Sequence, residues 1–164
     1  MSAVFERISE ALASRVTDSS VSHGILVLQI APPALLDVVA LLREKFRFDM
    51  LLDVTAVDWL GREPRFEVVW HLYSTAHRVR VRIKAGVAEA APTVDTLTGA
   101  YGSAHYMERE CHEMYGIVFA GNPDLRPILL YEGFQGHPLR KDYPKEREQP
   151  LVPYRPGYEL PGRE

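Results

Sequence analysis

The chain is poor in the residues that would place it outside a reducing compartment or inside a membrane. It has one cysteine, Cys111, among 164 residues, so no disulfide bond can form within it, and this usage is typical of a reducing compartment. No apolar run approaches the roughly 18 residues that a membrane-spanning helix needs. Residues 1–16 carry early acidic side chains and lack the basic start of a secretory signal. We therefore expect the chain to reach a membrane only by binding other proteins.

The chain also has little net charge and no motif for a common cofactor. Its formal charge of −3 argues against nucleic acid as the main partner. The glycine pairs Gly99/Gly102 and Gly133/Gly136 are isolated and do not lie between a strand and a helix in a phosphate-binding pattern. There is no Cys-x-x-Cys motif, so this chain cannot hold an iron–sulfur cluster alone. We expect no nucleotide and no cluster to be bound here.

The first third of the chain predicts two helices and one strand. Apolar residues recur every fourth position in 4–16, which is typical of an amphipathic helix, and residues 18–20 end it. Residues 25–30 form a short apolar run that suits a buried strand. A second amphipathic helix follows two prolines and has an apolar stripe between Leu35 and Phe46. Both stripes are more simply core faces than partner-binding grooves.

Three further strands are predicted at 50–59, 66–73 and 79–84, joined by short turns. In the last of them apolar and basic residues alternate strictly, which is typical of an antiparallel sheet with one buried face. The two early helices are available to cover that face. We therefore predict an α+β fold, with a mainly antiparallel sheet covered by helices in a first domain, residues 1–86.

The basic side chains of this last strand form a stripe that has two interpretations. Four cations lie on it, with Glu67 and Glu63 near enough on the preceding hairpin to balance part of their charge: Arg78, Arg80, Arg82 and Lys84. The simpler interpretation is a solvated face, and it is the one favoured by the sequence. The other is a docking surface for an acidic region of a partner.

Residues 87–116 are expected to contain a linker and two helices. Residues 85–92 are small and alanine-rich, 93–101 suit a short helix, and 104–115 suit a longer one that ends at Gly116 in a left-handed conformation. On the longer helix, the four-residue spacing allows Glu108 to meet His112 and Arg109 to meet Glu113. Its apolar face is formed by three residues: Met107, Cys111 and Met114.

Residues 117–164 are expected to form an extended, irregular tail. Eight of the twelve prolines of the chain follow Ala120, so helix and sheet are disfavoured there. The segment nevertheless contains Leu125, Ile128 and other apolar residues that are unusual in a solvated loop. It can lie across its own domain or on another protein, and the pattern alone leaves both open.

A metal site is a further hypothesis. His105, Glu108 and His112 share one helix face and are capable ligands, which would suit a stand-alone metal-dependent hydrolase. Their spacing is not the His-Glu-x-x-His pattern of zinc hydrolases, so paired surface charges are the simpler interpretation. Elemental analysis of the purified chain would separate the two.

Four short blocks in the last third resemble a known family. They read ERE at 108–110, MYGI at 114–117, GNPDLRPILL at 121–130 and GHPLRKDYP at 136–144. In this order and at this spacing they resemble the C subunit, or 30-kDa subunit family, of the proton-translocating NADH:quinone oxidoreductase, respiratory complex I. Glu113, Tyr115 and Asn122 depart from the usual Asp, Phe and His of that signature.

The resemblance implies a structural role. Members of that family are peripheral-arm subunits without catalytic residues that scaffold the quinone-reducing subunits D and B during electron transfer from NADH to quinone. The iron–sulfur clusters, FMN and the quinone belong to partner subunits, and no cofactor is expected on this chain. The implied location is the cytoplasmic side of a bacterial inner membrane. The equivalent subunit of a related membrane-bound hydrogenase-type complex is the alternative within the same family.

Together, the pattern and the resemblance predict a partner-binding set in the signature helix and the tail. We expect the helix charges to hold the basic residues of the tail, or to reach across an interface, while the tail presents apolar side chains to the partner. The predicted residues are Glu108, Arg109, Glu110, Asp124, Arg126, Leu129, Leu130, Phe134, Pro138, Leu139, Arg140, Lys141, Asp142 and Tyr143.

Overall fold

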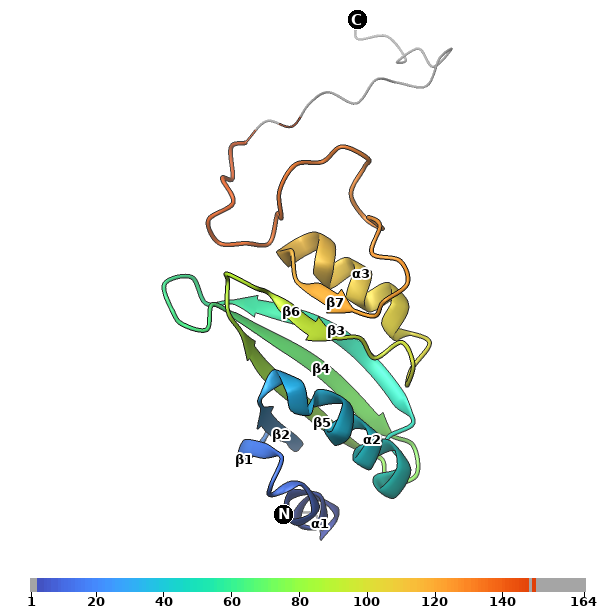
Figure 1. Cartoon of the computed structure of the whole chain (residues 1–164). Coiled ribbons are helices and arrows are strands. Elements are labelled where there is room, and N and C mark those ends of the chain that lie inside the picture. The colour runs from blue at the N-terminus through green and yellow to red at the C-terminus, as the bar shows by residue number, and fades with distance from the viewer. Residues whose placement is uncertain (1–2, 148, 150–164) are drawn as a thin grey trace, which may run out of the picture.

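A computed structural model describes residues 3–147 and 149 of the chain, so the last part of the predicted tail lies outside the described residues. The fold is α+β, as predicted, and is built on a sheet of five strands in the order β1-β2-β5-β4-β3 (Figure 1). The strands are β1 (Val16–Ser22), β2 (Ile25–Ile30), β3 (Met50–Asp58), β4 (Phe66–Ser74) and β5 (Val79–Val87).

The three predicted central strands are confirmed as an antiparallel meander. β4 pairs with β3 on one side and with β5 on the other, and both pairings are antiparallel. β2 then pairs with β5 in the parallel direction, from Leu26 opposite Val81 to Ile30 opposite Ala85. The parallel pairing is possible because the chain leaves β2 through helix α2 and returns along the far edge of the sheet.

The first strand was not predicted. Helix α1 (Ala3–Leu12) ends earlier than expected, and residues assigned to its end and to a turn form β1 instead. β1 and β2 make a tight hairpin at His23 and Gly24, whose φ values of 51° and 75° suit a two-residue turn of the primed type. Pairing with the strongly apolar β2 overrides the weak strand propensity of the polar β1 residues.

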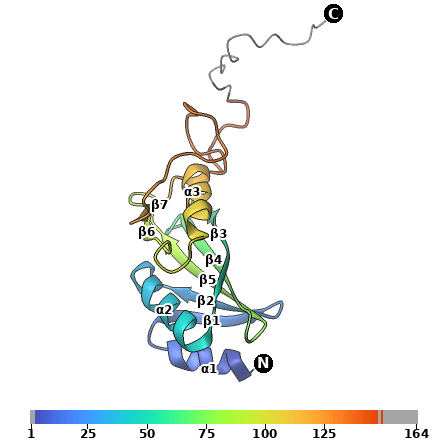
Figure 2. The same cartoon turned by 90° about the vertical axis from the view of Figure 1, so that its right-hand side faces the viewer.

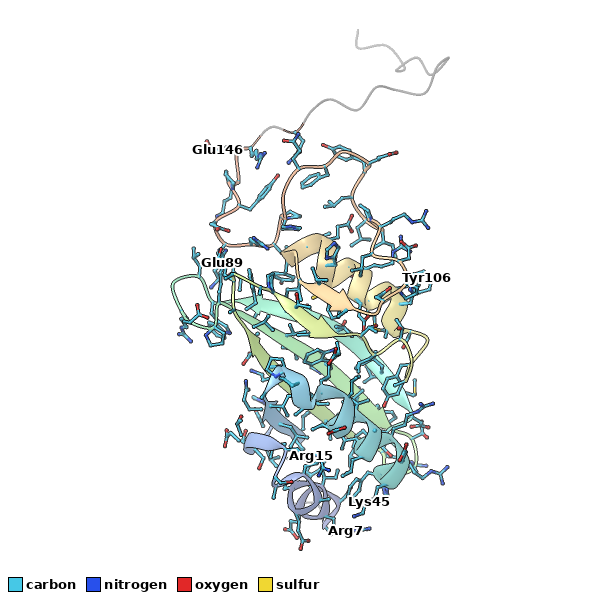
Figure 3. The ribbon with its side chains drawn as sticks, viewed as in Figure 1. Arg7, Arg15, Lys45, Glu89, Tyr106 and Glu146 are labelled. Atoms are coloured by element: carbon cyan, nitrogen blue, oxygen red, sulfur yellow. The ribbon has the colours of Figure 1, made fainter. Side chains whose placement is uncertain are left out.

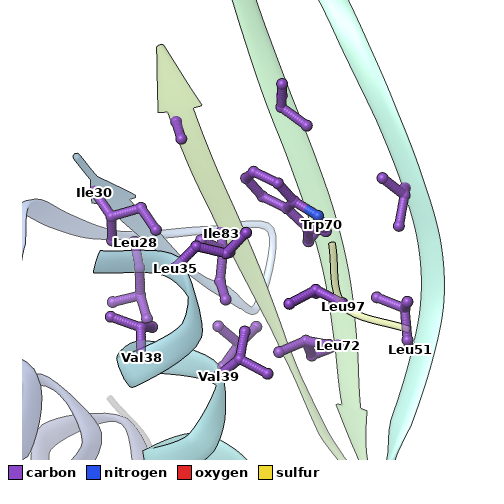
Figure 4. Packing of buried hydrophobic residues seen from close by; sticks show 14 of the residues in the cluster. Leu28, Ile30, Leu35, Val38, Val39, Leu51, Trp70, Leu72, Ile83 and Leu97 are labelled. Carbon is purple, nitrogen blue, oxygen red and sulfur yellow. The ribbon is translucent and has the colours of Figure 1, made fainter. Parts of the chain in front are cut away.

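The helices pack on one face of the sheet and complete the core there. Helix α2 (Leu35–Phe46) directs Leu35, Val38 and Val39 towards sheet residues that include Trp70 and Ile83 (Figure 4). Trp70, Ile83, Leu35 and Val38 are each 0 % exposed. Burying a side chain of this size contributes roughly 1.5–3 kcal/mol, so the two predicted apolar stripes are confirmed as core faces.

The segment after β5 differs from the predicted short helix at 93–101. It contains the strand β6 (Thr93–Asp95), which pairs in parallel with β7 (Val118–Ala120), and Leu97 beyond it is fully buried. The sequence could not show this pairing, because β7 lies beyond the next helix. That helix, α3 (Ala104–Tyr115), has the predicted bounds, and Gly116 ends it with φ 77°.

Helix α3 lies on the same side of the sheet as α2 and β6–β7, next to β3 (Figures 1 and 2). Its predicted apolar face is confirmed, since Cys111 and Met114 are buried and Met107 packs against the core. Among the described residues, no helix is long and apolar enough to cross a bilayer.

A buried hydrogen bond fastens the segment between β6 and α3 to the sheet, and its loss is testable. The Tyr101 hydroxyl donates to the Phe48 carbonyl oxygen at 2.7 Å, and Tyr101 is 6 % exposed. We expect Tyr101→Phe to lower the free energy of unfolding by about 1–3 kcal/mol, because it leaves a buried carbonyl without a donor. Urea unfolding would measure this. Tyr106→Phe, at a position that is 59 % exposed, is the matched control and should leave the midpoint unchanged.

Candidate partner-binding site

Residues 121–147, called the strap below, run over the C-terminal half of α3 without forming a helix or strand (Figure 1). A segment of this kind must find partners for its backbone N–H groups and carbonyls outside regular secondary structure. In this chain α3 supplies many of them. The contacts between the strap and α3 therefore determine the shape of the candidate site.

The end of α3 is capped largely by the strap. The last carbonyls of a helix have no partner within it, and here each of four receives a hydrogen bond. Gly116 N donates to His112 O at 2.7 Å, His137 Nδ1 to Glu113 O at 2.9 Å, Leu139 N to Met114 O at 3.2 Å, and Arg140 Nε to Tyr115 O at 2.6 Å. The Arg140 cation also suits the negative end of the helix dipole.

The approach of the strap requires glycine at position 116. A Cβ atom on Gly116 would lie 2.4 Å from Arg140 Nη2 and 2.5 Å from His137 Nε2. The φ of 77° independently favours glycine. Because His137 Nδ1 bonds to a carbonyl, this nitrogen carries the proton, and burial lowers the pKa of the ring below its ordinary value.

Glu113 holds the middle of the strap through its backbone. Its carboxylate is 6 % exposed and accepts the N–H groups of Ile128, Leu129 and Leu130 at 3.3, 2.9 and 2.8 Å. Hydrogen bonds to a charged acceptor are stronger than neutral ones, so this carboxylate fixes three successive residues. The predicted meeting of Arg109 with Glu113 is wrong: Arg109 donates instead to the Arg126 and Pro127 carbonyls at 2.8 and 2.9 Å.

Glu108 is fully buried and faces away from the strap cations. Its carboxylate accepts the Leu97 N–H at 2.7 Å, the Asn122 side-chain amide at 2.8 Å, and the Thr96 hydroxyl. The predicted pairing of Glu108 with His112 or with the strap cations is therefore wrong, because a buried carboxylate is satisfied here by the nearby loop groups. Asn122, one of the departures from the family signature, takes part in this buried set. Glu110 is exposed.

A buried ion cluster at Arg65 was missed by the sequence analysis. Arg65 is 3 % exposed and makes two bonds to Asp58, at 2.9 and 2.8 Å. It also bonds Glu89 at 2.6 Å and Asp142 of the strap at 2.7 Å, and Lys141 N donates to Asp58 at 2.8 Å. The signal in the sequence was weak: Asp58 and Arg65 flank a turn between two strands, and such residues can pair across a hairpin.

The cluster joins four parts of the chain and shifts its carboxyl groups. It connects the end of β3, the start of β4, the loop at Glu89 and the strap, and Glu89 lies beside the strap in Figure 3. Hydrogen bonds from the Arg65 guanidinium hold the pKa values of Asp58 and Asp142 below their ordinary range. Arg65 therefore anchors the end of the strap from below.

The remaining predicted residues divide into exposed and half-buried positions. Leu129 is 62 % exposed and Leu139 is 52 % exposed, while Leu130, Pro138 and Arg140 are half-buried. Asp124 pairs with the neighbouring Arg126 at 2.8 Å, and that bond holds the pKa of the Asp124 carboxyl below its ordinary range. Phe134 packs against two neighbouring aromatic rings of the strap, Tyr131 and Tyr143. Lys141 is exposed.

The residues of the hypothetical metal site do not converge. Glu108 is engaged as described, and His112 Nδ1 bonds the Ile117 carbonyl at 2.8 Å. Within residues 3–147 and 149, no three His, Cys, Asp or Glu side chains gather as a metal site would require. Cys111 is buried, and this burial raises the pKa of its thiol and disfavours the reactive thiolate.

The arrangement defines an α+β module with a strapped helix, and solved structures share its fold. The trypsin-resistant fragment (1–134) of Nqo5 matches with a TM-score of 0.64 and 28 % identity, over 74 % of this chain and 99 % of that one. A chain of the membrane-bound sulfane sulfur reductase, an archaeal respiratory membrane complex, matches with a TM-score of 0.68 over 77 % and 74 %. Its identity is 22 %, so this second likeness concerns the fold alone.

Sequence relatives identify the family. The family model of the respiratory-chain NADH dehydrogenase 30 kDa subunit matches residues 28–149. The NADH-quinone oxidoreductase C subunit of Roseiflexus sp. (strain RS-1) is 45 % identical over 148 residues, covering 89 % of this chain and 85 % of its own. The protein of the same name from Geotalea uraniireducens is 40 % identical over 138 residues, covering 84 % of each chain. The chain belongs to the 30 kDa subunit family of complex I, and the predicted resemblance is confirmed.

The Arg65 cluster makes stability depend on pH in a defined direction. The folded-state pKa of Asp58 is depressed, so its contribution is present above the unfolded pKa of about 3.9 and is lost as the pH falls through the folded value. We expect Arg65→Met to cost about 3–5 kcal/mol at pH 7, because Asp58 is left buried and unpaired, and to flatten the loss of stability below pH ~5. Urea unfolding from about pH 3 to about pH 7 would measure both effects.

The matched control for this change is Arg126→Met. Arg126 has an 83 % exposed side chain and pairs with Asp124 on the surface. Exposed pairs contribute at most about 1 kcal/mol, so the acid dependence of this variant should match that of the parent chain. An equal loss of stability in both variants would contradict the role of the cluster.

The Glu113 carboxylate should control the mobility of the strap. In Glu113→Gln one acceptor oxygen becomes an NH2 group that faces backbone N–H donors. Since each bond to a charged group contributes about 1.5–3 kcal/mol, we expect the amides of 128–130 to exchange at least about tenfold faster. Hydrogen exchange followed by mass spectrometry would measure this. Glu110→Gln, on the exposed side of the same helix, should leave the exchange unchanged, and slow exchange in both variants would refute the assignment.

Proposed function

We propose that the chain is a non-catalytic structural subunit in the peripheral arm of a proton-pumping NADH:quinone oxidoreductase. In this role it holds subunits D and B, which reduce the quinone, in position while electrons pass from NADH to quinone. Its proposed place is the cytoplasmic side of a bacterial inner membrane, where it is attached through its partners. Family membership supports the complex, and the strap supports the structural role. The family relatives named above favour this assignment over the hydrogenase-type alternative.

The observation that carries the proposal is the exposure of apolar side chains on a fixed backbone. Ile128 and Leu129 are 40 % and 62 % exposed, although their own N–H groups are held by Glu113. An unattached loop would turn such side chains inward. A segment that is ordered before binding loses less conformational entropy when a partner covers it, so this arrangement favours association.

The geometry assigns different tasks within the predicted partner-binding set. Glu108, Arg140 and Asp142 make bonds inside the chain, so we infer that they shape the strap. Leu129 and Leu139 are exposed and available to a partner. The proposed contact residues are therefore the exposed apolar ones, with the exposed charges of the strap around them, since aromatic and apolar anchors usually supply most of the binding energy.

The Nqo5 fragment supports the division between the body and the strap. That fragment, residues 1–134 of its protein, is described as trypsin-resistant, and it aligns almost completely with this chain. By analogy, we infer that the body of this chain resists proteolysis alone, whereas the later part of the strap and the residues beyond it gain protection from partners. Cleavage sites for trypsin are available there at Arg140, Lys141 and Lys145.

The direct test is a substitution at the most exposed apolar residue of the strap. We expect Leu129→Ser to lower recovery of subunits D and B with a tagged chain about thirtyfold, the effect of losing roughly 2 kcal/mol at a binding anchor. The unfolding midpoint should not change, because Leu129 is 62 % exposed. Quantitative mass spectrometry of the purified complex would measure recovery.

Leu36→Ser is the matched control for Leu129→Ser. Leu36 lies on α2 and is 48 % exposed, so both substitutions change an exposed leucine to the same residue. Recovery of D and B with this variant should equal that of the parent chain. Equal recovery with both variants would count against a partner-binding strap.

A further inference from the structure

The sheet has a second face that the strap and the helices leave open. α2, the β6–β7 pair and α3 lie on one side of the sheet in both views (Figures 1 and 2). Alternate residues of the inner strands point to that side and are fully buried, among them Trp70, Leu72, Val81 and Ile83. The residues between them point to the opposite side, where no helix of the described residues lies.

The centre of the open face carries a line of cations on β5. Arg80, Arg82 and Lys84 alternate with buried residues, so they stand roughly 7 Å apart along the strand. β5 is the middle strand of the sheet. The partners of these cations on β4 are uncharged or weakly charged: Tyr73 opposite Arg80, His71 opposite Arg82 and Val69 opposite Lys84. On the other side, Val27 lies opposite Arg82 and Gln29 opposite Lys84.

This line of charge is only partly neutralised within the chain. Lys84 pairs with Glu67 at 2.8 Å. In the part of the chain that the structure describes, Arg80 and Arg82 have no salt bridge, and the buried Nε of Arg82 has no hydrogen-bond partner. Asp53 lies on the edge strand beyond His71, two strands from β5, which places it roughly 10 Å away. The middle of the face therefore has an excess of positive charge.

The neighbouring histidine reflects the same field. Half-burial lowers the pKa of His71 below its ordinary value, and the charges of Arg82 and Arg80 lower it further, against the opposite effect of Asp53. His71 is therefore neutral near pH 7 and adds no charge of its own. With Tyr73 it supplies partly exposed aromatic surface beside the arginines, a combination that is common at the centres of protein interfaces.

We propose that this open face, defined by Arg80, Arg82, Lys84, His71 and Tyr73 and called the basic sheet face, docks an acidic segment of a neighbouring subunit. The carboxylates of that segment pair with Arg80 and Arg82, and the buried Arg82 Nε gains an acceptor. The surface is separate from the strap, so the inference goes beyond the proposed function. Arg78, which the sequence analysis placed in the same stripe, stands in the hairpin turn with φ 55° and is not part of the face.

A zero-length cross-link tests the occupant directly. Arg80→Lys keeps the charge and introduces an amine that a carbodiimide couples to a carboxylate in contact with it. In the assembled complex, we expect mass spectrometry to find position 80 joined to an Asp or Glu of another subunit. The parent chain, treated in the same way, shows which links arise from Lys84 and the other natural lysines. Absence of a link from position 80 to another subunit would overturn the proposal, as would links to this chain alone.

Charge reversal tests whether the contact matters for assembly. We expect Arg80→Glu to lower recovery of the partner subunits at least about tenfold, since like charges face each other across the interface. Arg80 is exposed, so the fold of the isolated chain should persist, and its unfolding midpoint is measured alongside. Arg15→Glu is the control with the same change in net charge, at an exposed position near α1 (Figure 3). Equal recovery with both variants would refute the proposal.

The two surfaces give distinguishable outcomes. If Leu129→Ser weakens assembly and Arg80→Glu does not, the basic sheet face is a solvated face and the proposed function stands. If Arg80→Glu weakens assembly and Leu129→Ser does not, the strap loses its assigned role and the sheet face keeps its own. Protection of Tyr73 from hydroxyl-radical oxidation in the complex, compared with the isolated chain, supports docking, and equal oxidation contradicts it.

Discussion

The pairing of backbone polar groups between α3 and the strap is the interaction on which the rest of the site depends. The strap has no regular secondary structure to satisfy its own N–H groups, and α3 ends with carbonyls that lack partners. The two needs are met together: the helix end accepts bonds from His137, Leu139 and Arg140, and the Glu113 carboxylate accepts three backbone N–H groups. An irregular segment becomes an ordered surface because a helix supplies its missing hydrogen bonds.

Charged and apolar residues have opposite tasks in this surface. Most of the carboxylates and guanidinium groups face inward, where Arg65 joins Asp58, Glu89 and Asp142 beneath the strap. Leucine side chains face outward. This reverses the usual distribution, because the inward charges bond backbone and ionic partners that an apolar side chain could not satisfy. The exposed leucines then offer area to a partner at little entropic cost, and the cationic sheet face offers a second, electrostatic surface.

Sequence patterns predicted much of the body and little of the contacts. The meander from β3 to β5, helix α2 and the bounds of α3 followed from periodicity and from the left-handed glycine at 116, which are local signals. β1 and β6 were missed because their strand character comes from pairing with β2 and β7. The salt bridges expected along α3 were wrong, since spacing on a helix shows which side chains can meet but not which competing partner lies nearer.

By itself, the sequence determined the fold class, the family and the presence of an apolar, charged and irregular segment after α3. These depend on composition, periodicity and ordered motifs, all of which are properties of the linear chain. The tertiary structure alone decided that Glu108 and Glu113 bind backbone groups, that Arg65 anchors the strap, and that one face of the sheet is left open. These depend on segments that are far apart in sequence, and only the folded chain brings their polar groups within bonding distance.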